Sequence, residues 1–475
     1  MLSCRRRCLL AGLLGLSFAM GAMMAPAAEP PANGPRELAP DPDMQIIGRV
    51  TANIISREHY RRQPLDEAIS ATLFDDFLKV LDPGKVYLAQ EDISSLEKYR
   101  KQAGQQLLQG DLSFPFAAYA VLVNKVDEYR RFAEELLQQE MRFDVDEDLV
   151  LDRSKLPWQP AAELRETWRK RLKNEILNLR LLRRAAASGE GPANPWGDRD
   201  PAVVVRERAG RYLQLLRDYD PMDVLELYLT SLANVYDPHS TYMSPATTED
   251  FNIQMRLSLA GVGAVLKSED GYAQITSIVP GGPAAKDGRL QPEDRIIAVA
   301  QGDGPPVEVL DMPLKKVVQY IRGQAGTEVR LTVLPAKQGA AAVPTVISLI
   351  REHVKLTEQE AKGEVRKLAL PGGTRTLRVG VLTLPSFYID FAAAYKAEKD
   401  YKSSSRDVAR LLAEFQKDEP LDGLILDLRG NGGGSLQEAI ALAGLFVEQK
   451  PVVQVRQANG RVEVQEDQQP NVAYR

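Results

Sequence analysis

The sequence predicts a multidomain α+β protein, in which a helical N-terminal module precedes a small β-barrel-like domain and the first part of an α/β domain. Three observations predict this order. Apolar residues recur at helical spacing between about residues 44 and 250. Short β-type runs alternate with Gly, Asp and Pro turns from residue 251 onwards. A strand, a run of glycines and a helix then follow one another within residues 421–446. A chain of 475 residues also exceeds one ordinary core, which favours several domains.

Residues 1–28 have the pattern of a secretory signal peptide. An Arg triplet precedes an apolar stretch, and the small residues Ala25, Ala27 and Ala28 mark the cleavage region. A membrane anchor is the alternative, but the apolar stretch is short and rich in Gly and Ala. The Pro-rich residues 29–43 are expected to form a leader. We therefore expect export to a bacterial periplasm.

The composition limits the chemistry of the exported chain. Cleavage would remove Cys4 and Cys8, the only cysteines, and three Arg, so that the net charge changes from −5 to −8. A disulfide, a thiol nucleophile and a Cys metal site are then excluded. The three histidines lie far apart in sequence, at His59, His239 and His353. We expect no metal site and no cofactor, and the mild negative charge argues against a nucleic-acid partner.

Residues 44–250 are expected to form the helical module. Its core is predicted from two apolar stripes at spacings of three and four residues. The first stripe consists of Ile69, Leu73, Phe77 and Val80. The second consists of Leu164, Trp168, Leu172, Ile176 and Leu179. Such stripes are typical of core packing, and we expect the module to hold or cover another part of the chain.

Residues 251–355 are expected to form the β-rich domain. The stretch LAGVGAVL resembles the carboxylate-binding loop of a PDZ domain, and VPGGPAAKDGRLQPEDRIIAVAQ is similar to the middle of that domain. The resemblance implies that loop N–H groups hold a C-terminal carboxylate while the tail adds as a strand to the sheet edge. The loop residues are Gly261, Val262, Gly263 and Ala264.

One amphipathic helix, LKKVVQYI, would form the other wall of the groove. Its apolar face carries Leu314, Val317, Val318 and Ile321, and the sequence leaves open which of them face the groove and which the core. Leu314 and Val318 are the peptide-binding candidates. Because this wall is apolar, we expect the groove to prefer apolar C-terminal side chains.

The glycine-rich stretch LDLRGNGGGSLQEAIALAGLF allows three functions for its exposed N–H groups. A Walker phosphate loop needs Gly-Lys-Ser/Thr, but no Lys follows Gly434. A dinucleotide fingerprint needs a third Gly where Ser435 stands. The third function is an oxyanion hole, in which N–H groups stabilise a charge that exists only in a tetrahedral intermediate.

This stretch, preceded by VGVLTLPSFY, resembles the catalytic domain of the carboxy-terminal processing (tail-specific) proteases, the S41 serine peptidases. NVYDPHSTYMSP is similar to a second motif of that family. The family's Asp-Leu-Arg-x-Asn-x-Gly-Gly pattern is matched by Asp427, Leu428, Arg429, Asn431, Gly433 and Gly434, while Gly432 replaces a frequent Pro. The resemblance implies an endopeptidase with a Ser nucleophile and a Lys base, and makes Gly433 and Gly434 the candidate oxyanion donors.

The same resemblance implies which partners to expect. They are protein substrates with apolar C-terminal tails, and an adaptor protein is a further candidate. The sequence does not indicate a peripheral membrane contact.

Other polar residues near the glycines have structural interpretations. Ser435 with Glu438 reads as a capping box at the start of a helix. Asp427 and Arg429 lie at a strand end and are expected to form a structural ion pair or to anchor the loop. His239 is expected to be a structural hydrogen-bonding residue.

The family's Ser and Lys are expected beyond the glycine turn, but they are not found there. After Phe446 the sequence contains no Ser, and Lys450 comes too early. We therefore interpret residues 356–475 as the N-terminal part of an S41 peptidase domain, and the sequence as a fragment whose half-built sheet leaves an open edge. The alternative is a truncated, non-catalytic PDZ protein that captures apolar tails.

Overall fold

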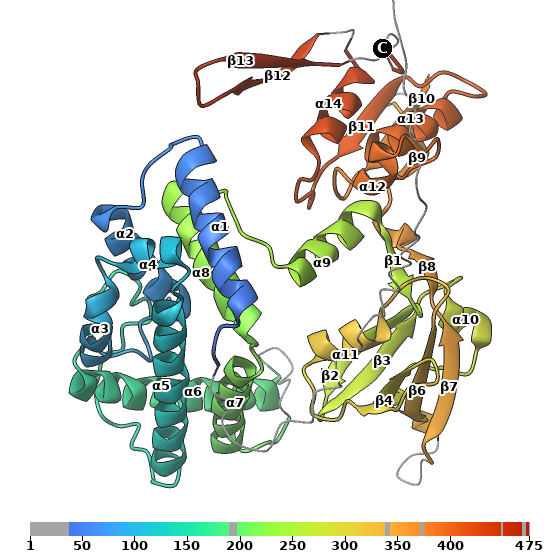
Figure 1. Cartoon of the computed structure of the whole chain (residues 1–475). Helices are drawn as coiled ribbons and strands as arrows, with labels where there is room; N and C mark the ends of the chain where they lie inside the picture. Colours follow the sequence, from blue (N-terminus) through green and yellow to red (C-terminus); the bar gives the residue numbers. More distant parts are fainter. Residues whose placement is uncertain are drawn as a thin grey trace, which may run out of the picture. The chain divides into compact units, whose positions relative to one another are not determined.

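The computed structural model of the chain describes residues 38–189, 197–337, 343–370, 375–447, 450–467 and 472–474. The expected signal peptide, residues 1–28, lies outside the described residues, as does the leader up to residue 37. The first helix, α1, begins at Pro42. Figure 1 shows a helical N-terminal region, a middle domain rich in strands and a mixed C-terminal region.

The N-terminal region consists of helices joined by short loops. Several of them begin at an Asp or Ser whose side chain accepts a hydrogen bond from the first turn, as Asp41, Asp66 and Ser244 do. The helices are α1 (Pro42–Glu58), α2 (Glu67–Leu81), α3 (Gln90–Leu96), α4 (Ala103–Gln109), α5 (Ser113–Leu136), α6 (Ala161–Ser188), α7 (Pro201–Arg217), α8 (Pro221–Tyr236) and α9 (Pro245–Arg256), with the 3-10 turn η1 (Glu97–Tyr99).

The apolar stripe predicted in α6 is confirmed, because all five of its residues are buried. Trp168 lies at its centre, and the indole N–H donates a hydrogen bond to the Val86 carbonyl. The stripe predicted in α2 is only partly right. Leu73 and Phe77 are fully buried and Ile69 is half-buried, but Val80 is 47% exposed.

The error at Val80 has a geometric cause. The buried face of α2 is centred on Leu73, Phe74, Phe77, Leu78 and Leu81. At about 100° per residue, Val80 lies about 90° from the middle of that face, so it reaches the margin rather than the core.

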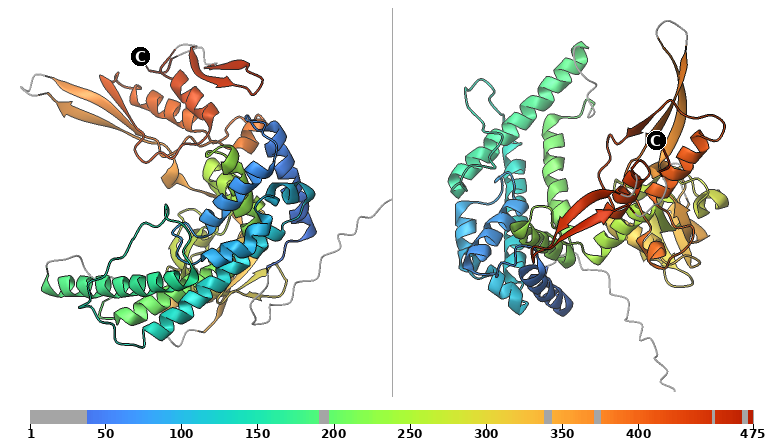
Figure 2. Two further views of the ribbon diagram at one scale, coloured as in Figure 1. Left: turned by 90° about the vertical axis from the view of Figure 1, so that its left-hand side faces the viewer. Right: turned by 90° about the horizontal axis from the view of Figure 1, so that it is seen from above.

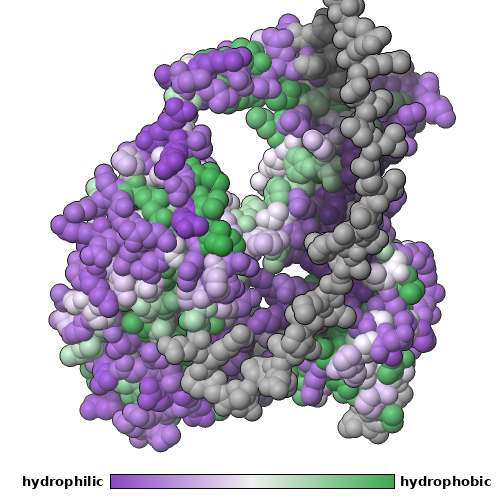
Figure 3. Space-filling view, viewed as in Figure 1, coloured by the Kyte–Doolittle hydropathy of each residue, from purple (hydrophilic) through white to green (hydrophobic). Residues whose placement is uncertain are grey.

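Hydrophobic side chains are also exposed on the surface of the helical region. Figure 3 shows them gathered over α1, where Ile46, Val50 and Ile54 follow one another every four residues and are each about half exposed. None of the described helices combines the length and the apolar character needed to cross a bilayer.

The middle domain is an antiparallel sheet with the strand order β2-β3-β4-β6-β7, and the short β5 pairs with β4. No pairing among the described residues joins β2 to β7, so the expected barrel-like sheet is open. Helix α11 closes over a core that includes Val317, Ile321 and Leu331. The elements are β2 (Ala264–Glu269), β3 (Tyr272–Ile278), α10 (Pro283–Asp287), β4 (Arg295–Gln301), β5 (Val307–Glu308), α11 (Leu314–Ile321), β6 (Glu328–Leu334) and β7 (Thr345–Ile350).

The strands that precede and follow the middle domain in the chain pair to form a two-stranded ribbon. Strand β1 (Ser258–Gly261) pairs antiparallel with β8 (Glu352–Lys355). Leu257, just before β1, is buried in the core of the C-terminal region, and the N–H of Leu356 donates to its carbonyl. Helix α9 ends at Arg256, so it runs across the expected boundary between residues 250 and 251.

The C-terminal region has a three-stranded sheet of order β11-β10-β9, in which β10 pairs in parallel with β11 and antiparallel with β9. Figure 2 shows the β9–β10 hairpin extending beyond the rest of this sheet. Helix α13 packs on β9 and β10, and no further strand pairs with β11 among the described residues. The elements are η3 (Thr357–Gln359), β9 (Lys362–Ala369), β10 (Thr376–Thr383), α12 (Phe391–Tyr395), α13 (Ser404–Phe415), β11 (Gly423–Asp427), α14 (Leu436–Gly444) and the hairpin β12 (Pro451–Arg456) with β13 (Val462–Glu466).

Candidate functional site

The glycine turn connects the end of β11 to the start of α14 and is held by the side chain of Asn431. Its Nδ2 donates to the Leu384 carbonyl at 2.9 Å, and its Oδ1 accepts from the Gly433 N–H at 2.8 Å. Leu384 directly follows β10, the neighbour of β11 in the sheet. The Asn431 amide therefore ties the turn to the adjacent strand end.

Gly434 fits a place that no other residue could take. Its φ is +142°, and a Cβ built on it would lie 2.4 Å from the Phe387 carbonyl oxygen. The backbone of Phe387 bridges this position, because its N–H donates to the Gly433 carbonyl at 2.9 Å and its carbonyl accepts from the Ser435 N–H at 2.8 Å.

The two candidate oxyanion donors differ in what they contact. The Gly433 N–H is occupied by Asn431. The Gly434 residue is exposed, and its N–H has no hydrogen-bond partner in the described part of the chain. In this conformation Gly434, rather than Gly433, offers a donor to a ligand.

Ser435 is the N-cap of α14, which confirms one half of the predicted capping box. Its Oγ accepts from the Glu438 N–H at 3.4 Å. The reciprocal half is wrong, because the Ser435 N–H bonds to Phe387 and not to the Glu438 carboxylate.

Glu438 instead caps the neighbouring helix. Its side chain is buried, and Oε2 accepts from the Ser403 Oγ at 2.7 Å, the Ser404 Oγ at 3.0 Å and the Ser405 N–H at 2.8 Å. These donors lie at the N-terminus of α13, where a negative charge is favourable. The carboxylate thus fastens α13 to α14.

The only described lysine next to these serines in sequence, Lys402, is also committed to structure. Its Nζ lies 2.6 Å from Asp407 and 2.9 Å from Glu360. Asp407 in turn accepts from the Tyr388 hydroxyl at 2.6 Å, and burial raises the pKa of that hydroxyl. The contacts with Asp407 and Glu360 hold the Lys402 Nζ between α13 and the segment before β9.

The expected ion pair of Asp427 and Arg429 is confirmed. The guanidinium contacts the carboxylate with Nε at 2.9 Å and NH2 at 2.6 Å. These bonds lower the pKa of Asp427 to about 2. His239, expected to be a hydrogen-bonding residue, lies 3.2 Å from the Asp237 carboxylate and is exposed.

The second candidate site is the loop of Gly261 to Ala264 in the middle domain. Gly263 has a φ of +74°, and a Cβ there would lie 3.2 Å from the Cα of Gly282. The loop is fixed through its carbonyls, because those of Val262 and Gly263 accept from Ala284 and Val279. These two carbonyls thus hold the loop against the segments of Val279 and Ala284.

The expected groove lies between β2 and α11, which contact each other. Strand β2 is an edge of the sheet, so its outer backbone groups can pair with an added strand. Val317 and Ile321 belong to the core, whereas Leu314 and Val318 are half-buried. Of the four residues on the predicted apolar face, the two peptide-binding candidates are therefore the ones that keep an accessible surface.

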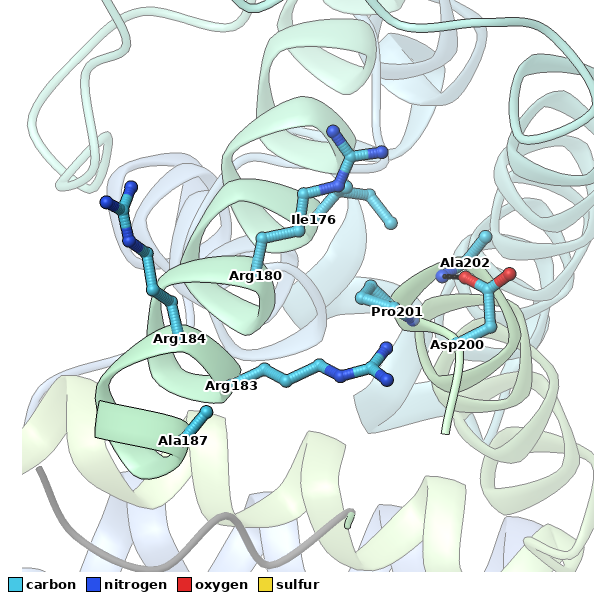
Figure 4. Close-up of a pocket in the computed structure, with 8 residues that line it drawn as sticks. All are labelled: Ile176, Arg180, Arg183, Arg184, Ala187, Asp200, Pro201 and Ala202. Atoms are coloured by element: carbon cyan, nitrogen blue, oxygen red, sulfur yellow. Dashed lines mark hydrogen bonds between the residues drawn. The ribbon is translucent and has the colours of Figure 1, made fainter. Parts of the chain in front are cut away.

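A cavity of about 400 Å³ lies elsewhere, between the end of α6 and the start of α7. Arg180, Arg183 and Arg184 line it, and Figure 4 shows Arg183 pointing toward Asp200 and Pro201. Arg180 stacks on Phe143, 4.5 Å from its ring centre, and Arg183 lies 3.5 Å from Asp198. The described residues contain no group of three or more His, Cys, Asp or Glu that could hold a metal ion.

Comparison with known proteins matches three successive parts of the chain. Family models for the tail specific protease N-terminal domain, the PDZ domain and peptidase family S41 match residues 51–246, 250–334 and 378–475. The chain is 34% identical over 435 residues to the tail-specific protease of Haemophilus influenzae, which covers 91% of this chain and 58% of that protein. The chain belongs to the carboxy-terminal processing, or tail-specific, protease family.

Two further relatives of this family are similar over shorter parts. The carboxy-terminal processing protease CtpA of Bacillus subtilis is 29% identical over 229 residues, which are 48% of this chain and 42% of that protein. A solved PDZ domain of a carboxy-terminal protease from Vibrio cholerae, in complex with peptide, is 44% identical with a TM-score of 0.20 and covers 21% of this chain and all of that one. The chain thus spans 58% of the length of the Haemophilus influenzae protease and 42% of the length of the Bacillus subtilis protease.

One residue of the tail-specific protease turn was missed by sequence reasoning. The family pattern contains Asn431 without indicating a role for it, whereas in the structure its side chain occupies one of the two expected donors. An Asn two residues before a glycine is a known signal for a side chain that bonds the backbone locally, and that signal could have indicated it.

Proposed function

We propose that the chain is part of a periplasmic serine endopeptidase that recognises nonpolar protein C-termini through its PDZ domain and degrades or processes those proteins. The observation that carries the proposal is the free edge of β2, which follows the Gly263 loop and lies beside the half-buried Leu314 and Val318. A tail can pair with this edge while its last side chain enters an apolar groove.

The catalytic chemistry that we propose is acyl transfer. As in the S41 family, a neutral Lys would take the proton of a Ser hydroxyl, which would attack the peptide carbonyl. The N–H of Gly434 would then donate to the oxyanion, a contribution of about 3–4 kcal/mol to transition-state stabilisation for one such donor. This assignment is supported by the occupied Gly433 N–H.

We propose further that the nucleophile and the base are not among residues 1–475. Three serines near the glycine turn have structural partners, since Ser435 caps α14 and both Ser403 and Ser404 donate to Glu438. No serine follows Phe446 in the sequence. The chain alone would then bind tails without cutting them.

A non-catalytic tail-binding protein is the second candidate function. The contacts of Lys402 support it, because two carboxylates hold the Nζ of this lysine, which directly precedes Ser403 in sequence. Reading the coding DNA beyond codon 475 distinguishes the two candidates. A continuing frame with a Ser/Ala-rich strand and a Lys supports the enzyme, and a stop codon supports the binding protein.

The location is also a proposal, based on the signal-peptide pattern of residues 1–28. Cell fractionation with N-terminal sequencing of the mature protein should find it in the periplasm, beginning near residue 29. An adaptor protein that delivers substrates is a further proposed partner, testable by affinity capture from periplasmic extract.

The decisive experiment offers the chain without residues 1–28 two peptides that end in apolar residues, one with a free carboxylate and one amidated. Binding and cleavage are measured together. Carboxylate-dependent binding without cleavage supports both the PDZ site and the missing dyad. Equal binding of both peptides, or of neither, would refute the tail-binding role, and cleavage that survives repeated purification would place the nucleophile within these residues.

A further inference from the structure

The direction and register of a bound tail follow from the position of the Gly261–Ala264 loop. This argument rests on the tail-binding function proposed above. A carboxylate held by the loop N–H groups lies at the beginning of β2, so the tail runs back along β2 in the antiparallel direction. The last residue then lies opposite Ala264, and the residue three positions earlier, position −3, lies opposite Lys267.

The two faces of β2 differ in character. Ala264 and Leu266 pack against the core of the domain, on the side where α11 lies. Val265 is 46% exposed and the Lys267 side chain is 44% exposed, on the other face. Because directly opposite residues in a sheet point to the same face, the side chain at position −3 would stand beside Lys267.

Lys267 is a charged group whose present partner can be exchanged. Its Nζ lies 2.5 Å from Glu269 Oε2, two residues further along the same strand, and the Glu269 side chain is 43% exposed. This hydrogen bond raises the pKa of Lys267, so the ammonium stays charged at neutral pH. Exposed pairs of this kind contribute little, and an acidic residue of the tail can replace or share Glu269 at small cost.

On its outer side, Lys267 has no partner strand. Its cross-strand neighbour is Gln274 of β3, and no strand pairs with the other edge of β2 in the described part of the chain. Glu293 adds further negative charge near the ammonium. The structure thus places one lysine at the level of the fourth residue from the end of a bound tail.

We propose that Lys267 is a specificity-determining residue, which selects protein tails that carry Asp or Glu three residues before an apolar C-terminal residue. The preference comes from a cross-strand ion pair on the solvent face of β2. Exposed cross-strand pairs predict a modest preference, about two- to five-fold in Kd over Ala at the same position.

The test uses fluorescence anisotropy with the chain lacking residues 1–28 and a set of eight-residue peptides that differ only at position −3. The peptide with Asp should bind about two- to five-fold more tightly than the peptide with Ala, and the peptide with Lys more weakly. In Lys267→Met the preference for Asp over Ala should be lost. In Lys267→Glu the order should invert, and in 1 M salt the wild-type preference should vanish because screening weakens exposed pairs.

The matched control is Lys337→Met. Lys337 is exposed and follows β6, three strands away from β2 in the sheet order. This variant should keep the wild-type preference. A preference for Asp that survives in Lys267→Met, or one that disappears in Lys337→Met, would overturn the assignment.

Failure of this inference can be distinguished from failure of the proposed function. If binding depends on the carboxylate but the peptides that differ at position −3 all bind with equal affinity, only the role of Lys267 is refuted. If no peptide with a free carboxylate binds better than its amidated form, the tail-binding function fails, and this inference fails with it.

Discussion

Replacing Gly434 by Ala should disrupt the glycine turn, whereas replacing Gly432 should not. The added Cβ at position 434 would lie 2.4, 2.8 and 2.9 Å from the O, C and N atoms of Phe387. All three are backbone atoms, so no side chain can move aside. The backbone bridge to Phe387 must therefore open.

The expected size follows from what is lost. The bridge consists of two hydrogen bonds, of 2.9 and 2.8 Å, each with a net contribution of about 1 kcal/mol. Holding Ala at a φ of +142° costs a further 1–3 kcal/mol or so. Gly434→Ala should thus lower the local stability of the turn by about 3–5 kcal/mol. Gly432 has open space around it, and its replacement should cost less than about 1 kcal/mol.

Hydrogen exchange followed by mass spectrometry measures this local effect. The three Trp residues stand at positions 158, 168 and 196, so intrinsic fluorescence reports the helical region and not the turn. In Gly434→Ala, peptides covering residues 384–390 and 431–444 should exchange at least 100-fold faster than in wild type, since each 1.4 kcal/mol corresponds to a factor of ten. Equal protection in Gly434→Ala and Gly432→Ala would refute the reasoning.

Three further predictions concern other residues of the two sites. Glu438→Ala should destabilise the contact between α13 and α14 by about 3 kcal/mol or more, because three buried donors lose their acceptor. Glu438→Gln should destabilise it by less, and hydrogen exchange at the start of α13 measures both effects. Val318→Asp should weaken binding of an apolar tail at least ten-fold in anisotropy, while Val346→Asp, at an exposed position of β7, should leave it unchanged. The pKa of Asp427, measured by NMR, should be about 2 and should rise toward 3.8 in Arg429→Ala. Because folding lowers this pKa, the ion pair stabilises the fold at pH values above 3.8, the ordinary pKa of the carboxyl. The stabilisation is lost as the pH falls through about 2.

The sequence predicted helix faces well where the apolar stripe is broad and central. Trp168 and its four companions in α6 were all placed correctly, because a stripe at spacings of three and four fixes the buried side of a long helix. Val80 was misplaced because the spacing alone does not show where the buried face is centred. That centre depends on helices α5 and α8, which contact α2 from distant parts of the chain.

The candidate site was predicted in outline, and its polar contacts were not. Ser435 was correctly assigned as a helix cap from its local pattern. The partners of Glu438 could not be predicted, because Ser403 and Ser404 lie more than 30 residues away in sequence and meet the carboxylate only through tertiary packing. Likewise, the choice between Gly433 and Gly434 as donor depends on the rotamer of Asn431, which a sequence motif does not contain.

The β1–β8 ribbon makes the PDZ domain an insertion with adjacent ends. Gly261 leaves the ribbon directly opposite Glu352, where the chain returns. The four residue pairs of the ribbon hold the two ends of the inserted domain together, whatever the length of the chain between β1 and β8. The entropic cost of closing such a loop grows only slowly with its length. A recognition domain mounted in this way can be exchanged for another, or lengthened, while the frame that receives it stays the same. Under the proposed function, the part that selects substrates could then change independently of the region that matches peptidase family S41.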